Sequence, residues 1–255
     1  MFIDTHAHIQ DDMLKDRVIE IVASAKENNV GKIVCASYDL SSSDTAVEFA
    51  NKFEGVFATV GVHPENCEYY NLDVERKLIE LCKDKKVIAI GEIGLDYHYT
   101  KENKERQKEV FEKQILLADK LSLPVVIHTR DAIGDTLEIV RKNKDKLKKG
   151  GVFHCFHESK EVLNEIISLG FYVSYGGVIT FNNANSLREI VAYTPVERML
   201  TETDCPYMTP VPKRGQINSP ENIPLIVKKL SEIKKIDEKE LEKILEQNTK
   251  NIYGI

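Results

Sequence analysis

The sequence has few cysteines, no C-x-x-C pair and no long apolar run. Its five cysteines form an odd set, which argues against a disulfide framework and against a zinc site made of thiolates. They are Cys35, Cys67, Cys82, Cys155 and Cys205. No window is apolar enough to cross a bilayer, and no charged and apolar leader precedes the first strand-like run. We therefore expect a soluble, cytoplasmic protein with no membrane attachment.

An excess of positive charge is lacking as well. The chain carries a formal net charge of −6, so the molecule as a whole is weakly repelled by nucleic acid. A substrate that bears phosphate must then be held locally, by metal ions and a few cationic side chains. No low-complexity linker divides the 255 residues, and we expect one domain over residues 1–255.

Short strand-like runs alternate with amphipathic helical patterns along the chain. The predicted strands cover residues 2–6, 32–37, 56–63, 87–92, 124–130, 151–156, 171–176 and 198–204. Their nearly continuous apolar character is typical of strands buried on both faces. This predicts the α/β class and favours a closed (β/α)8 TIM barrel over an open doubly wound sheet. The last helix is expected after Asp237, which forms a capping box with Glu240.

Side chains that bind metals recur where these runs stop. His6 and His8 lie two residues apart at the end of the first run, so both imidazoles point to the same side of a strand. Residues of the same kind end four later runs. These are Glu92, His128, His154 and Asp204. Each one alone is more often structural. Because a barrel gathers the carboxyl ends of its strands at one face, the six together predict a metal site there.

Longer motifs occur in a fixed order along the chain. They are MFIDTHAHI (1–9), GVHP (61–64), GEIGLDYH (91–98), RQKEVFEKQILLADKLSLPVVIHTRDA (106–132), GVFHCF (151–156) and ETDCPYMTP (202–210). In these motifs the chain resembles the TatD family of metal-dependent deoxyribonucleases, within the amidohydrolase superfamily. The resemblance spans nearly the whole chain. It implies a TIM barrel, a site for two divalent cations, and hydrolysis of the phosphodiester bonds of DNA, often from an end.

The resemblance also distributes the predicted ligands between two metal positions. His6, His8 and Asp204 match the residues that hold one cation. His128 and His154 match those that hold the second. Imidazole and carboxylate ligands leave the identity of the metal open among Zn²⁺, Mn²⁺ and Mg²⁺.

Two carboxylates are candidate catalytic residues. Glu92 matches the carboxylate that bridges both cations, a place suited to a side chain with two oxygens. Asp204 is the best candidate for accepting the proton of a water activated by the two metals. Glu202 lies two residues before Asp204 and is a candidate supporting partner.

Substrate contacts are expected close to these ligands. Arg130 lies two residues after His128 and therefore on the same side, where its planar fork suits a phosphate. His63 in GVHP matches a family motif and is a second candidate for binding substrate. Arg214, in the loop after the eighth run, is a third, whereas for Lys213 in that loop we favour a solvated surface position.

Aromatic residues and cysteines also adjoin the predicted ligands. The aromatic set is Tyr97, His98, Tyr99, Phe156 and Tyr207. These rings can stack on the bases of an unpaired end, although aromatic residues at a barrel mouth more often pack loops together. Cys155 and Cys205 are expected on the opposite strand face from the ligands, which argues against a thiolate nucleophile.

The predicted partner is DNA, as single strands or frayed ends, because the chain lacks a basic stripe along which a duplex can be tracked. No obligate protein partner is indicated. Two alternatives stay open. The same barrel and metals serve hydrolases of amides, lactones and phosphoesters, so a small-molecule hydrolase is the first. The second is a barrel that binds nucleic acid or a protein without catalysis, which the intact ligand set disfavours.

Overall fold

The computed structural model describes residues 1–98 and 102–255. In this part of the chain eight parallel strands pair in sequence order in one sheet. They are β1 (Phe2–Ala7), β2 (Val30–Ala36), β3 (Val56–Val60), β4 (Val87–Asp96), β5 (Val125–Arg130), β6 (Gly151–Phe153), β7 (Tyr172–Tyr175) and β8 (Met199–Thr201). An open doubly wound sheet reverses its strand order, and this sheet does not. The predicted TIM barrel is therefore confirmed.

The last strand and the first are joined through side chains and loop backbone. Thr5 Oγ1 donates to the carbonyl of Thr201 over 2.9 Å, and Thr201 Oγ1 donates to the carbonyl of Ile3 over 3.1 Å. Just beyond β8 the backbone N–H of Asp204 donates to the carbonyl of His6. The contact between β1 and β8 thus fixes two predicted ligands side by side.

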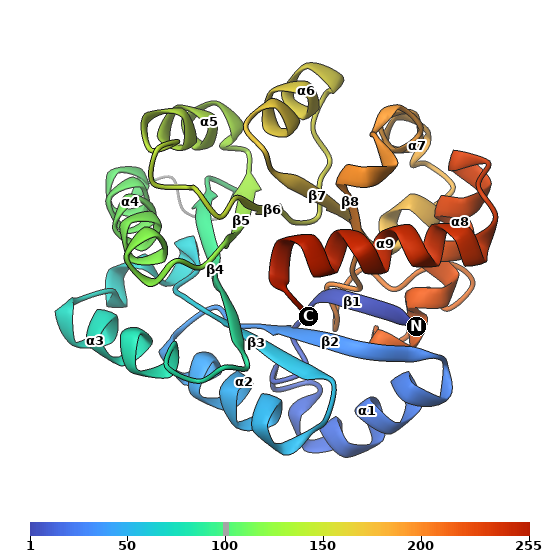
Figure 1. Cartoon of the computed structure of the whole chain (residues 1–255), viewed down its shortest axis with the longest axis horizontal. Helices are drawn as coiled ribbons and strands as arrows, with labels where there is room; N and C mark the ends of the chain where they lie inside the picture. The colour runs from blue at the N-terminus through green and yellow to red at the C-terminus, as the bar shows by residue number, and fades with distance from the viewer. Residues whose placement is uncertain (99–101) are drawn as a thin grey trace.

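Helices follow the strands and surround the barrel (Figure 1). They are α1 (Val18–Glu27), α2 (Leu40–Lys52), α3 (Leu72–Leu81), α4 (Lys104–Leu121), α5 (Ile133–Lys142), α6 (Lys160–Ser168), α7 (Asn185–Tyr193), α8 (Ile223–Lys234) and α9 (Glu238–Tyr253). Their apolar faces pack on the strands and form the larger part of the core with them. Among the described residues, no helix has the length and apolar content needed to cross a membrane.

Helix α9 lies across the end of the barrel at which the strands begin (Figure 1). Asp237 caps its first turn as predicted, and its carboxylate accepts from the backbone N–H of Lys239 and Glu240. Among the described residues, no return bond from the Glu240 side chain completes the predicted capping box. At its far end Tyr253 packs among apolar side chains of the strands. These include Val34, Val126, Val152 and Leu200. Side chains therefore fill this end of the barrel.

Some strands end at residues other than those predicted. β6 stops at Phe153 and β8 at Thr201, so His154 and Asp204 lie beyond their strands and not within them. The chain leaves the extended conformation there, with a left-handed φ of 52° at Asp204. β4 instead continues to Asp96, which places Glu92 inside the strand and corrects its predicted position at the strand end.

Candidate metal centre

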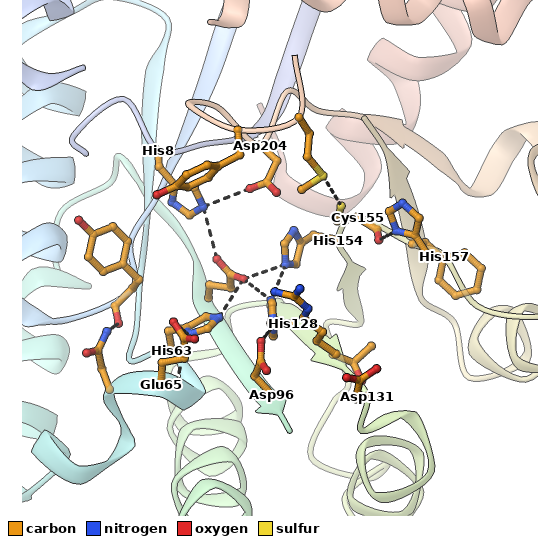
Figure 2. Close-up of a pocket in the computed structure, with 18 of the residues that line it drawn as sticks. His8, His63, Glu65, Asp96, His128, Asp131, His154, Cys155, His157 and Asp204 are labelled. Atoms are coloured by element: carbon orange, nitrogen blue, oxygen red, sulfur yellow. Dashed lines mark hydrogen bonds and ion pairs between the residues drawn. The ribbon is translucent and has the colours of Figure 1, made fainter. Parts of the chain in front are cut away.

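A cavity of about 970 Å³ opens at the end of the barrel where the strands finish. Five of the six predicted ligands line it. They are His8, Glu92, His128, His154 and Asp204. The sixth, His6, is buried, with 1% of its surface exposed. In Figure 2, His8 and Asp204 lie together, and His63 and His128 lie across the cavity from them.

The two carboxylate oxygens of Glu92 face different histidines. Oε2 lies 3.2 Å from Nε2 of His6 and 3.6 Å from Nε2 of His8. Oε1 lies 2.7 Å from Nδ1 of His128 and 2.8 Å from Nε2 of His154. The carboxylate therefore connects two pairs of imidazoles.

Asp204 joins the first of these pairs. Its Oδ1 lies 3.3 Å from Nε2 of His8 and 3.8 Å from Nε2 of His6. The second pair has a different neighbour, because Nε2 of His63 lies 3.5 Å from Oε1 of Glu92. The six predicted side chains thus form two adjacent groups that share one carboxylate.

The donor atoms of these groups fit divalent cations. Nε2 of His6 is 3.3 Å from Nε2 of His8, and Nδ1 of His128 is 3.1 Å from Nε2 of His154. In each of two groups of three residues, one ligand atom per residue lies within 4.8 Å of the other two. The trios are His6 with His8 and Glu92, and His63 with Glu92 and His128. Buried imidazole nitrogens and carboxylate oxygens converging in this way are the usual ligands of Zn²⁺ and Mn²⁺.

The side chains of the cluster shift one another's pKa. Burial, and then the neighbouring His154, lower the pKa of His6 to about 4 and keep that ring neutral. Burial opposes the charge on His8 too, but its hydrogen bond to Asp204 raises the pKa to about 9. Burial alone would raise the pKa of Glu92, yet the surrounding imidazoles hold it well below its usual value. Glu92 is therefore an ionised carboxylate at neutral pH, as cation binding requires.

Two of the predicted ligands are oriented from behind by hydrogen bonds. His8 donates from Nδ1 to the carbonyl of Ala36 over 2.7 Å, which leaves Nε2 facing the cluster. His128 donates from Nε2 to Oδ2 of Asp96 over 2.9 Å, which leaves Nδ1 facing Glu92. The sequence interpretation missed Asp96. Its signal is its place in the GEIGLDYH motif, four residues after Glu92 on the same strand.

Glu202 lies behind His154, where it was predicted as a supporting partner. None of its surface is exposed. Its Oε1 accepts from the backbone N–H of Cys155 over 2.6 Å, and its Oε2 accepts from Oγ of Ser174 over 2.5 Å. Nδ1 of His154 lies 3.9 Å from Oε1. Burial raises the pKa of Glu202 to about 8, against the opposing charge of His154.

The structure brings two of the three predicted substrate contacts to the cavity. His63 and Arg130 line it, and among its described lining residues Arg130 is the only lysine or arginine. Arg214 is not part of the described lining. Its guanidinium packs over the ring of Phe181, 3.9 Å from the ring centroid.

Some of the predicted aromatic residues line the cavity and others do not. Phe156 and Tyr207 line the cavity, and so does Tyr38, which the sequence interpretation missed because it follows a strand without a ligand. Tyr97 instead donates its hydroxyl to Asp135 over 2.7 Å. His98 pairs with Asp131 at 3.0 Å, and Tyr99 lies outside the described residues.

The expected orientation of Cys155 is wrong. Its side chain lines the cavity, because a left-handed φ of 47° breaks the alternation of an extended strand. Its thiol lies 3.7 Å from the sulfur of Met208. Burial, and then the charge of Asp204, raise the pKa of Cys155 well above its usual value, so the group is a neutral thiol. The expectation that it is no thiolate nucleophile therefore agrees with its surroundings.

Comparisons with known proteins agree with this geometry. The family model described as TatD related DNase matches residues 3–254. The chain is 37% identical over 255 residues to an uncharacterized metal-dependent hydrolase, YabD, of Bacillus subtilis, and the match covers 100% of both proteins. It is 31% identical over 246 residues to the 3′-5′ ssDNA/RNA exonuclease TatD of Shigella flexneri, with 94% of each protein covered.

A solved structure is similar over the whole barrel. The crystal structure of YJJV, a TatD homologue from Escherichia coli, superposes with a TM-score of 0.93 at 28% identity. The superposition covers 100% of this chain and 98% of that one. On these matches, and on the cluster of ligand side chains at the barrel mouth, the chain belongs to the TatD-related DNase family and is a metal-dependent hydrolase.

Proposed function

We propose that this protein removes nucleotides from an end of single-stranded DNA by hydrolysing phosphodiester bonds with two divalent cations. The whole chain acts as one domain in this proposal. The observation that carries it is the division of Glu92 between two groups of ligands, with one oxygen toward each. The Shigella relative, named as a 3′-5′ exonuclease of single-stranded DNA and RNA, supports the choice of substrate.

Six side chains hold the cations in this proposal. They are His6, His8 and Asp204 at one position, His128 and His154 at the other, and Glu92 at both. Divalent cations at such a site supply Lewis acidity, which activates water and offsets charge on phosphoryl oxygens. The remaining steps belong to the side chains of the chain itself.

Asp204 accepts the proton of the attacking water. Its carboxylate lies at the cavity wall beside His8 and is therefore near both the first position and the substrate. Burial favours the neutral acid, but the hydrogen bond from His8 and the neighbouring imidazoles hold the pKa of Asp204 at about 2. The group is therefore ionised, as a side chain that accepts a proton must be.

His63 and Arg130 position the scissile phosphate. Nδ1 of His63 accepts from the backbone N–H of Glu65 over 3.2 Å, so the neutral ring carries its proton on Nε2, toward Glu92 and the cavity. Burial, and then His128, lower the pKa of His63 to about 3, which keeps it a neutral donor. Arg130 offers a planar pair of donors to phosphate oxygens. A contact from Arg214 stays a prediction of the sequence alone.

The charge of the cavity wall favours an end of the nucleic acid. Carboxylates line the cavity beside the ligands. They include Asp11, Glu65, Asp131 and Glu158. They repel a phosphate backbone that lies across the mouth, whereas a terminal nucleotide brings few phosphates past them. Tyr38 and Tyr207 line the cavity and are the rings on which its base can stack.

An oligonucleotide digest tests the proposal. A single-stranded oligonucleotide labelled at the 3′ or at the 5′ end is incubated with purified protein and Mn²⁺, Zn²⁺ or Mg²⁺. We expect stepwise shortening, which chelator or Glu92→Ala abolishes. Glu48→Ala, which alters an exposed carboxylate of α2, is the matched control and should cleave normally. Early loss of the 3′ label identifies the 3′ end as the site of attack.

Two other outcomes identify the alternatives. If no oligonucleotide is cleaved with any metal and a lactone or amide is turned over, the protein is a small-molecule hydrolase. If wild type and Glu92→Ala bind nucleic acid equally and nothing is turned over, the barrel is a binding module.

A further inference from the structure

Two predicted ligands lie between two buried carboxylates. The rings of His6 and His154 stack, with centroids 4.1 Å apart and an angle of 8° between their planes. Nε2 of each ring faces Glu92, at 3.2 Å for His6 and 2.8 Å for His154. Nδ1 of His154 faces Oε1 of Glu202 at 3.9 Å. One ring of this stack belongs to each of the two ligand groups.

The Nδ1 atoms of the stacked rings have no hydrogen-bond partner among the described residues. His6 is 1% exposed and His154 is 7% exposed, so solvent reaches neither ring freely. A buried polar atom left in this way is destabilising, and native proteins rarely leave one unsatisfied. Ligand atoms of His6, His154 and Glu202 lie within 4.8 Å of one another. One carboxylate is therefore within reach of both rings.

Glu202 in turn lacks the partners that a buried carboxylate needs. Its two hydrogen bonds come from neutral donors, the backbone N–H of Cys155 and the hydroxyl of Ser174. Each oxygen of a carboxylate can accept more than one hydrogen bond, and Glu202 has no exposed surface through which water could fill the remaining places. An imidazole that binds a cation through Nε2 keeps its proton on Nδ1, and the N–H of a ligating histidine is usually donated to a carboxylate or carbonyl. The two imidazoles therefore have N–H groups without acceptors, and Glu202 has the acceptor oxygens that could receive them.

We infer that Glu202 is a positioning residue shared by both metal positions. It accepts the Nδ1 protons of His154 and His6 and so orients one ligand of each cation. The inference rests on the two-metal function proposed above. An ordinary hydrogen bond of about 2.9 Å requires Nδ1 of His154 and Glu202 to approach by only about 1 Å. Asp96 differs, because the one predicted ligand that it contacts is His128.

Titration of metal-free protein with Zn²⁺ tests this difference. Glu202→Gln has nearly the same shape and keeps an acceptor for the N–H of Cys155. We expect it to weaken both binding steps by roughly 10- to 100-fold, and Asp96→Asn to weaken only one step by a similar factor. Ser174→Ala is the matched control. It removes a donor to Glu202 without touching an imidazole, and should change the affinities less than Glu202→Gln does.

The outcomes separate this inference from the function on which it rests. If Glu202→Gln binds Zn²⁺ as tightly as wild type at either step, the shared role is overturned and the metal centre stands. If wild type binds no Zn²⁺, the proposed function itself fails.

A second measurement needs no variant. Nitrogen-15 NMR of the imidazoles in Zn²⁺-loaded wild type should show the Nδ1 protons of His6 and His154 shifted downfield and exchanging slowly. Rapid exchange and ordinary shifts for these protons overturn the inference even if Glu202→Gln does not fold.

Discussion

Oδ2 of Asp96 lies 2.9 Å from Nε2 of His128, on the side of the ring away from Glu92. Asp96 is itself fixed by Gln107 of α4. Gln107 accepts from the backbone N–H of Asp96 over 2.9 Å and donates to its carbonyl over 2.8 Å. The direction of a predicted metal ligand therefore depends on the packing of a helix against the outside of the barrel.

The first prediction follows from this contact. Asp96→Asn keeps the size of the side chain but loses the charge that orients His128. We expect the rate of oligonucleotide cleavage at limiting metal to fall by roughly 10- to 100-fold. Rates measured over a range of Mn²⁺ concentrations should recover in part at high metal. Asp73→Asn on α3, where the side chain is 88% exposed, is the control for loss of one charge. An unchanged metal dependence in Asp96→Asn would contradict the prediction.

Removal of metal should destabilise the folded protein. The ligands converge only in the folded barrel, so a cation binds the native state in preference to the unfolded chain. At a free concentration 100 times the dissociation constant this contributes about 2.7 kcal/mol, or a rise in Tm of about 5–10 °C for a chain of this size. Thermal unfolding with Zn²⁺ and with chelator measures the difference. Glu92→Gln should lose most of it, and equal Tm values for wild type in both conditions would argue against a metal centre.

Arg130 should matter for substrate and not for metal. Arg130→Ala removes a charged donor from the cavity wall, and we expect kcat/KM for an oligonucleotide to fall by roughly 10- to 100-fold. The slope of log KM against log salt concentration should fall by about one unit, the amount expected for one lost phosphate contact. The affinity for Zn²⁺ should stay the same.

Arg214→Ala is the companion measurement. Its guanidinium packs on Phe181, away from the described cavity lining. We therefore expect kcat/KM to fall less for Arg214→Ala than for Arg130→Ala. A loss equal to that of Arg130→Ala would show that the loop after β8 reaches the substrate, as the sequence predicts.

The cap of α9 should contribute to stability alone. Asp237→Ala removes a carboxylate that accepts two backbone N–H groups at the start of the helix. Loss of such a cap costs about 1 kcal/mol. Urea unfolding should show a lower midpoint with an unchanged slope, and the cleavage rate should stay at the wild-type value because α9 lies at the opposite end of the barrel from the cavity. An unchanged midpoint would mean that the last helix does not need this cap.

The sequence predicts the barrel well because each strand is an apolar run that stops at a polar residue. It predicts where the strands end less well. Cys155 and Asp204 take left-handed conformations, which no periodicity reveals. Asp204 still reaches the predicted ligands, but the side chain of Cys155 lines the cavity, against the expected direction. Asp96 was missed for a related reason. β4 runs past Glu92 because Gly94 lets it approach β5 closely. A Cβ at Gly94 would lie 2.0 Å from the carbonyl oxygen of His128.

Contacts between side chains that lie far apart in the sequence could not be predicted either. Tyr38 follows a strand that carries no predicted ligand, so its place at the cavity depends on the closed barrel. The same holds for Glu202. Its spacing from Asp204 indicated a supporting role, but its place behind His154 needs β6, β7 and β8 in register.

The packing of α9, with Tyr253, against the end of the barrel where the strands begin has a kinetic consequence for the proposed reaction. Among the described residues, side chains fill the end of the barrel where the strands begin, and the cavity opens at the other end. Substrate and product therefore share this opening in the proposed reaction. A freed mononucleotide must depart by the route along which the shortened strand advances. Accumulated mononucleotide should therefore bind in the cavity and slow turnover by product inhibition.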